Sequence, residues 1–312
     1  MLKKYTGTFL ILIFVHSVVI AQDTLSIAPI KNNKRLWLTT GIHATVYAGS
    51  LIALNEAWYK GYPKRGFTSF DDSREWLQVD KIGHAWSAYN LSRGSALSWK
   101  WAGLCEKNAA LLGSASGFAF LTVIEFLDAR SSNWGWSWSD IAANTVGTGL
   151  YLSQQLAWGE QRIQYKFSFH SKSYVDNSLD LRSDKLFGKT WYERMLKDYN
   201  GQTYWFSANL KSFWKESNLP AWLNIAIGYG ADGMFGGFDN TAKDANGNII
   251  FDRRDIPRVR QFYLSPDIDL TKIKTNKKWL KTTLFLLNSL KVPAPALMLD
   301  SRGRFRLHPL YF

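Results

Sequence analysis

The sequence has one cysteine, Cys105, among 312 residues, so no disulfide can form within the chain. It also lacks the motifs G-x-S-x-G, G-x-x-x-x-G-K-[ST], H-E-x-x-H and C-x-x-C. These absences argue against the α/β-hydrolases, P-loop nucleotide hydrolases, zincin metalloproteases and thioredoxin-like proteins that carry those motifs. With five histidines in all, the chain is also poor in the commonest metal ligand. We therefore expect neither a metal nor a cofactor.

The N-terminus has the pattern of a secretory signal peptide. Lys3 and Lys4 precede an apolar run from Phe9 to Ile20, and Ala21 occupies the small-residue position before a cleavage site. We expect residues 1–21 to be removed and the mature chain to start near Gln22. An uncleaved membrane anchor is the alternative. No cysteine lies near position 21 to carry a lipid, so this signal is not that of a lipoprotein.

The chain has fewer acidic residues, 25, than basic ones, 38, and the excess of basic side chains lies mainly in the second half. Residues 22–159 contain 12 basic and 10 acidic side chains, whereas residues 160–312 contain 24 and 15. On an exported chain, a basic half indicates contact with anionic membrane lipid or lipopolysaccharide, and we expect no nucleic-acid partner. A basic solvated surface explains the same counts. The expected location is the outer membrane or periplasm of a Gram-negative bacterium, and no protein partner is indicated.

Long, strongly hydrophobic runs are also absent after the signal. Four long segments, 36–54, 80–101, 108–124 and 141–157, are rich in Gly, Ala, Ser and Thr. Three of them contain no Asp, Glu, Lys or Arg, whereas 80–101 is mixed and carries Asp80, Lys81, Arg93 and Lys100. Small residues such as Gly113 and Gly117 allow helices to approach closely. The sequence therefore predicts about four helices, either partly within a bilayer or forming a compact bundle.

From about residue 162 the pattern changes to period two, which is typical of antiparallel strands. Alternation is clear in 163–169, 204–210, 223–229, 258–270 and 304–312, and a short helix is expected over 276–290. We predict an α+β fold: an N-terminal helical bundle followed by an antiparallel strand-rich part, which is either barrel-like or an open sheet covered by helices. The expected domains are 22–159, helical, and 160–312, basic and strand-rich.

Polar pairs at helical spacing occur in three of the expected helices. Asp80 and His84 are four residues apart with Lys81 between them; Glu125 and Asp128 are three apart; Asp140 and Asn144 are four apart. Residues at these spacings share one helix face. Ser139 or Asp140 is also expected to cap its helix. We predict that the three pairs meet in one polar cluster. Each pair alone is also explained by helix capping or by its position at a solvent-exposed helix end.

Three alternating tryptophans, Trp134, Trp136 and Trp138, precede Asp140. In an extended loop they would project to one side as an aromatic platform for sugar or lipid. Packing or anchoring at a membrane interface is the alternative.

The segments 80–89 and 125–151 resemble the pattern D-K-x-x-H, E-x-x-D and D-x-x-x-N-x-x-G of the YfiM-like family of periplasmic lipoproteins and, more loosely, of VanZ-like membrane proteins. The resemblance implies an envelope protein with a helical core. It assigns no activity, because the YfiM-like family has none established. The chain differs from the first family in lacking a lipid-bearing cysteine, and from the second in its weak hydropathy and long strand-rich extension.

Two functions remain open at this point. One is an envelope protein without catalysis, in which Asp80, Lys81, Asp140 and Asn144 form a binding or structural cluster. The other is a hydrolase or transferase that acts on a lipid-linked or glycan substrate, with His84, Glu125 and Asp128 as catalytic residues. In the second case His84 and Glu125 are the acid and base, and Lys81 holds an anionic group.

Overall fold

The computed structural model describes residues 32–311 except 56–62, 133 and 245. The expected signal peptide, residues 1–21, lies outside the described residues. The chain divides into two compact units. The first comprises the described residues up to Asp72, together with His84–Gln161 and Lys274–Leu287; the second comprises Ser73–Gly83, Arg162–Ile273 and Asn288–Phe312.

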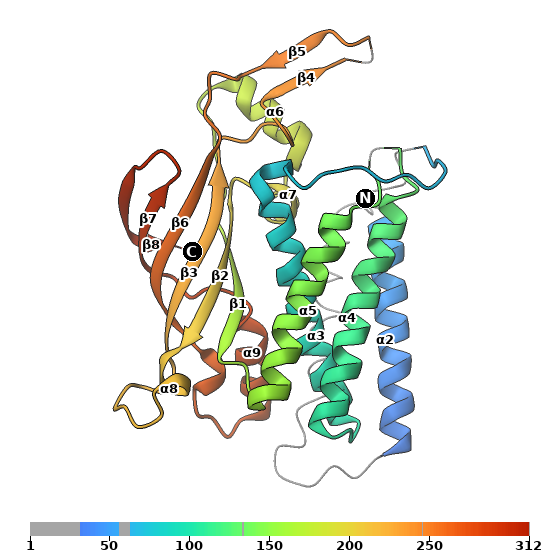
Figure 1. Ribbon diagram of the computed structural model, residues 1–312, viewed down its shortest axis with the longest axis vertical. Helices are drawn as coiled ribbons and strands as arrows, with labels where there is room; N and C mark the ends of the chain where they lie inside the picture. The colour runs from blue at the N-terminus through green and yellow to red at the C-terminus, as the bar shows by residue number, and fades with distance from the viewer. Residues whose placement is uncertain (1–31, 56–62, 133, 245, 312) are drawn as a thin grey trace. The chain divides into compact units, whose positions relative to one another are not determined.

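The first unit contains long helices that run side by side (Figure 1). They are α2 (Asn33–Leu54), α3 (Val79–Trp101, of which the part from His84 belongs here), α4 (Glu106–Asp128) and α5 (Trp138–Trp158), with the shorter α9 (Lys278–Leu287). The four long helices confirm the predicted bundle. Among the described helices, α4 alone is long and apolar enough to cross a membrane, a statement about its length and composition only.

Glycines set the close spacing of these helices. A Cβ added to Gly113 would lie 2.6 Å from the Ala96 Cα of α3, and one added to Gly117 would lie 2.9 Å from the Ser92 N of the same helix. On α5, a Cβ at Gly147 would lie 2.0 Å from the Ala85 carbonyl oxygen. Because no side chain fits at these positions, α4 and α5 both touch the α3 backbone, as the small-residue pattern predicts.

The second unit contains an open antiparallel sheet of six strands, which confirms the α+β class and the open-sheet alternative. The strands, in spatial order, are β1 (Ile163–Phe169), β2 (Gln202–Asn209), β3 (Leu223–Asp232), β6 (Val259–Ile268), β7 (Ala294–Asp300) and β8 (Phe305–Tyr311). Each strand therefore pairs with the one before it in the chain, apart from the hairpin β4 (Thr241–Lys243) and β5 (Ile249–Asp252), which is inserted between β3 and β6 (Figure 1). The remaining elements of this unit are η4 (Glu75–Gln78), α6 (Asn177–Phe187), α7 (Trp191–Lys197), α8 (Leu210–Phe213) and η5 (Leu270–Lys272).

The buried face of the sheet is partly polar. Lys166, Asp267 and Lys291 are almost fully buried there, with Asp267 2.7 Å from the Lys166 ammonium and 3.6 Å from that of Lys291. Ser207 donates a hydrogen bond to the same carboxylate at 2.6 Å, and burial lowers the pKa of Lys291. A buried charge is costly unless it is paired. The three segments that carry these side chains must therefore be aligned in the register that brings the charges together.

Candidate functional site

His84, on α3, is surrounded by oxygen atoms from α4 and α5. Its Nδ1 lies 3.3 Å from the Asn144 side-chain oxygen and 3.6 Å from a Glu125 carboxylate oxygen, and its Nε2 lies 3.9 Å from an Asp140 oxygen. The three neighbours are buried, whereas the His84 side chain remains 21% exposed. The imidazole is therefore the most accessible of the four groups. We call His84, Glu125, Asp140 and Asn144 the imidazole cluster.

Helix packing explains why these residues meet. Asn144 lies three residues before Gly147, where α5 touches α3, and Glu125 lies two turns after Gly117, where α4 touches α3. Close contact at the two glycines brings both polar side chains within reach of His84. The small residues and the polar residues of the sequence thus act together.

The start of α5 holds Asp140 in place. Ser137 is the N-cap and accepts a hydrogen bond from the Asp140 backbone N–H at 2.9 Å, so the expectation that Ser139 or Asp140 is the cap was wrong. Asp140 instead lies in the first turn, where the helix dipole favours a carboxylate. Buried Asp72, which sequence reasoning missed, accepts hydrogen bonds from the Ser137 and Ser139 hydroxyls at 2.6 and 2.5 Å.

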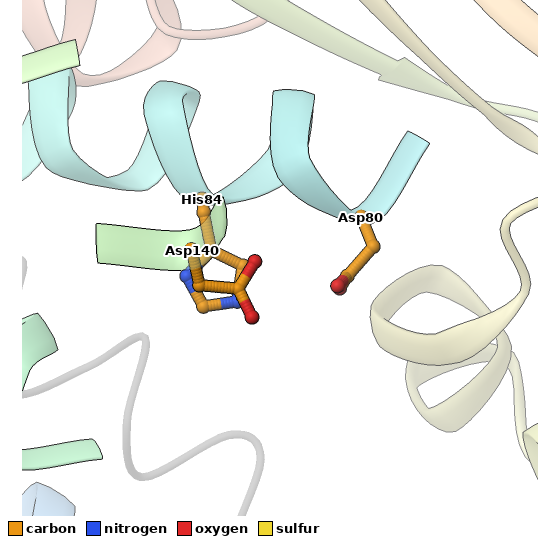
Figure 2. Close-up of side chains that lie close together, drawn as sticks. All are labelled: Asp80, His84 and Asp140. Carbon is orange, nitrogen blue, oxygen red and sulfur yellow. The ribbon is translucent and has the colours of Figure 1, made fainter. Parts of the chain in front are cut away.

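Asp80 precedes His84 by one turn of α3, and both project from the same side of the helix (Figure 2). Its carboxylate accepts hydrogen bonds from Lys81 at 3.0 Å and from the Tyr199 hydroxyl at 2.7 Å. One potential ligand atom from each of Asp80, His84 and Asp140 lies within 4.8 Å of the other two. Two carboxylates and an imidazole form a donor set that a divalent cation accepts.

The other predicted site residues lie near the end of α4 and the start of α5. Asp128 is the half-buried last residue of α4, one turn beyond Glu125. Trp138 is the first residue of α5 and is 71% exposed, whereas Trp134 and Trp136 are half-buried. Trp136 packs edge-on against Trp138, with ring centroids 5.4 Å apart, and also contacts Phe67. Trp138 is thus the member of the three that solvent reaches most.

Comparison with known proteins gives one match. The model of a family described as "Predicted periplasmic lipoprotein (DUF2279)" matches residues 67–154, the stretch that holds α3, α4, most of α5 and the whole imidazole cluster. No curated protein and no solved structure matches the chain. Residues 67–154 are therefore similar to a family of predicted periplasmic lipoproteins, in agreement with the exported, periplasmic location expected from the sequence.

Proposed function

We propose that this chain is an exported cell-envelope protein whose helical unit carries an acid–base site centred on His84. The observation that supports the proposal is the placing of an oxygen acceptor near each imidazole nitrogen. Histidine is the side chain best suited to move protons near neutral pH, and a fixed acceptor on one nitrogen directs the other to its task.

Each residue has a distinct part in this proposal. The Asn144 oxygen accepts a hydrogen bond from Nδ1–H at 3.3 Å and thereby holds the proton on that nitrogen. Glu125, 3.6 Å from Nδ1, stabilises the positive charge that arises when Nε2 takes up a second proton. The 3.9 Å between Nε2 and Asp140 is longer than a hydrogen bond, so both groups can act on one substrate group placed between them.

The proposed substrate class is a lipid-linked or glycan component of the envelope, and the proposed reaction is hydrolysis or group transfer. Its support is the exposed indole of Trp138, two residues before Asp140, because an indole face packs well against sugar rings or acyl chains. The membrane lipid or lipopolysaccharide expected as a partner belongs to the same proposal. Lys81 is expected to hold an anionic group, and in the structure its ammonium donates a hydrogen bond to the Asp80 carboxylate.

The test compares His84→Gln with His43→Gln. His43 lies on α2, where its Nε2 is 3.1 Å from the Ser98 hydroxyl, and it serves as a matched control away from the imidazole cluster. Each purified protein is incubated with peptidoglycan fragments and with envelope lipid extracts, and products are sought by mass spectrometry. We expect products with the unchanged protein and with His43→Gln but not with His84→Gln. Absence of any product from the unchanged protein contradicts the proposal.

A second candidate function is a non-catalytic envelope protein in which the imidazole cluster is a structural polar centre. The observation that favours it is the complete burial of Asn144 and the near-complete burial of Glu125. In that case His84→Gln lowers the free energy of unfolding, because buried partners lose their bonds, and no substrate is turned over. Thermal unfolding of the same variants separates the two functions.

A further inference from the structure

The outward face of the six-stranded sheet is apolar, the reverse of the usual arrangement in a water-soluble antiparallel sheet. One continuous row runs across five paired strands, and its members are Phe206, Ile227, Leu264, Leu297 and Leu307. Every side chain in this row is at least 40% exposed, and Ile227 reaches 63%. A second row, formed by Phe262, Leu299 and Phe305, is exposed beside it. We call these two rows the apolar face.

The opposite face of the sheet is buried and mixed in character, because it holds the core cluster of Trp205, Ala226, Tyr263, Ala296, Met298 and Tyr311 together with polar groups. Residues between those of the apolar face, such as Ser207, Ser265 and Asp267, point inward and are buried with Lys166. Large apolar side chains on the outward face, with buried polar groups on the other side of the sheet, are also found in strands that face lipid. On a protein in aqueous solution, an exposed apolar surface of this extent marks a binding site for a protein or a membrane.

The two ends of the apolar face carry the groups that a bilayer surface requires. At the end formed by the start of β3, Trp214 and Trp222 are exposed, and Lys211, Lys215 and Lys272 lie in the adjoining segments. At the other end, the β7–β8 turn carries Arg302 and Arg304. Indoles are favoured at the level of lipid headgroups, and basic side chains complement anionic headgroups.

The apolar face is also hollowed. A depression of about 350 Å³ is lined by Leu223, Ile225, Leu264, Pro266, Leu297 and Leu307, among others, and its walls are almost entirely hydrocarbon. A shallow apolar depression of this kind suits the flexible end of an acyl chain.

We infer that the apolar face binds the surface of an anionic lipid bilayer, with acyl chains against the two rows and headgroups at the basic, tryptophan-bearing ends. The sheet lies in the interface and does not cross the bilayer, because the open edge of β8 would leave backbone groups without partners in hydrocarbon. This inference does not depend on the proposed acid–base site.

The test uses the purified full-length protein and vesicles of phosphatidylcholine with or without phosphatidylglycerol. The double variant Ile227→Thr/Leu264→Thr removes apolar surface from the centre of the face. The control Val175→Thr/Leu181→Gln changes two exposed apolar residues of the same unit that lie outside the face. In cosedimentation we expect the affinity of the first variant for anionic vesicles to be lower by about tenfold or more. The control should bind as the unchanged protein does. Equal binding by the two variants overturns the inference.

A second measurement keeps the test decisive if the double variant fails to fold. In a Cys105→Ser background, Leu264→Cys is labelled with an environment-sensitive fluorophore, and Val175→Cys serves as the control. We expect a blue shift on adding anionic vesicles at position 264 only. A label at 264 that does not respond to vesicles overturns the inference, as does a blue shift that appears without vesicles, rises with protein concentration and accompanies dimerisation in analytical ultracentrifugation.

Discussion

The contact between α3 and α5 at Gly147 can be tested by adding a single methyl group. In Gly147→Ala the new Cβ would lie 2.0 Å from the Ala85 carbonyl oxygen, whereas ordinary contact begins at 3.4 Å. The obstacle is backbone, so no side-chain rotation relieves it and the helices must separate. Overpacking of this kind costs about 1–3 kcal/mol, against a gain of about 0.5–1 kcal/mol for Ala over Gly within a helix.

Gly149 on the same helix supplies the control, because a Cβ there meets nothing within 4 Å. We expect Gly149→Ala to raise the free energy of unfolding by about 0.5–1 kcal/mol and Gly147→Ala to lower it by about 1–2 kcal/mol. The assay is denaturant unfolding followed by the helix signal in circular dichroism. If the two variants are equally stable, α5 does not touch the α3 backbone at this point, and the explanation given for the meeting of His84 and Asn144 fails.

Three further predictions concern buried polar groups. The double variant His84→Ala/Glu125→Ala should cost less stability than the sum of the single variants, with a coupling of about 0.5–3 kcal/mol in a double-mutant cycle; strict additivity would show that the 3.6 Å pair does not interact. Asp267→Ala leaves the Lys166 and Lys291 ammonium groups without their shared carboxylate and should cost about 3–5 kcal/mol in denaturant unfolding, far more than Asp252→Ala at an exposed ion pair with Arg254; equal costs would show that the buried charges are compensated otherwise. Burial lowers the pKa of His170 from 6.5 to about 4, so its neutral form contributes stability above pH 6.5 that is lost as the pH falls towards 4; His170→Gln should flatten the pH dependence of the melting temperature in this window, and an unchanged slope would refute the assignment.

The helices and most strands were predictable because their patterns are local. The stretch 163–169 alternates throughout and forms β1 over the same residues. In contrast, α6 and α7 were missed, since each is short and charged, although the capping box of Thr190 and Glu193 marks the start of α7. The strand β7 was also missed, because Pro293 and Pro295 indicate a helix end and say nothing of a strand that pairs with β6.

The site was predictable in part for the same reason. Spacing on single helices places His84, Glu125, Asp140 and Asn144 on defined faces, and small residues indicate which faces pack. No local pattern, however, joins Lys166 of β1, Asp267 of β6 and Lys291, which lie far apart in the chain and meet only in the folded sheet. The hydrogen bond from Tyr199 to Asp80 likewise spans 119 positions and has no signature in the sequence.

The strand order of the sheet has a consequence for how an exported chain folds. A polypeptide crosses the inner membrane in an extended form and emerges progressively, so early segments wait for later ones. Here each strand of the six-stranded sheet pairs with the preceding strand of that sheet. Among the described strands only the β4–β5 hairpin intervenes, and the other connections, apart from the β7–β8 turn, hold short helices. Each newly emerged strand can therefore pair at once with a strand that is already folded. Only the most recently added strand then has an unpaired edge that could bind a wrong partner. In a sheet whose neighbouring strands are far apart in the sequence, apolar residues would stay exposed in the periplasm for longer before their partner strand emerged.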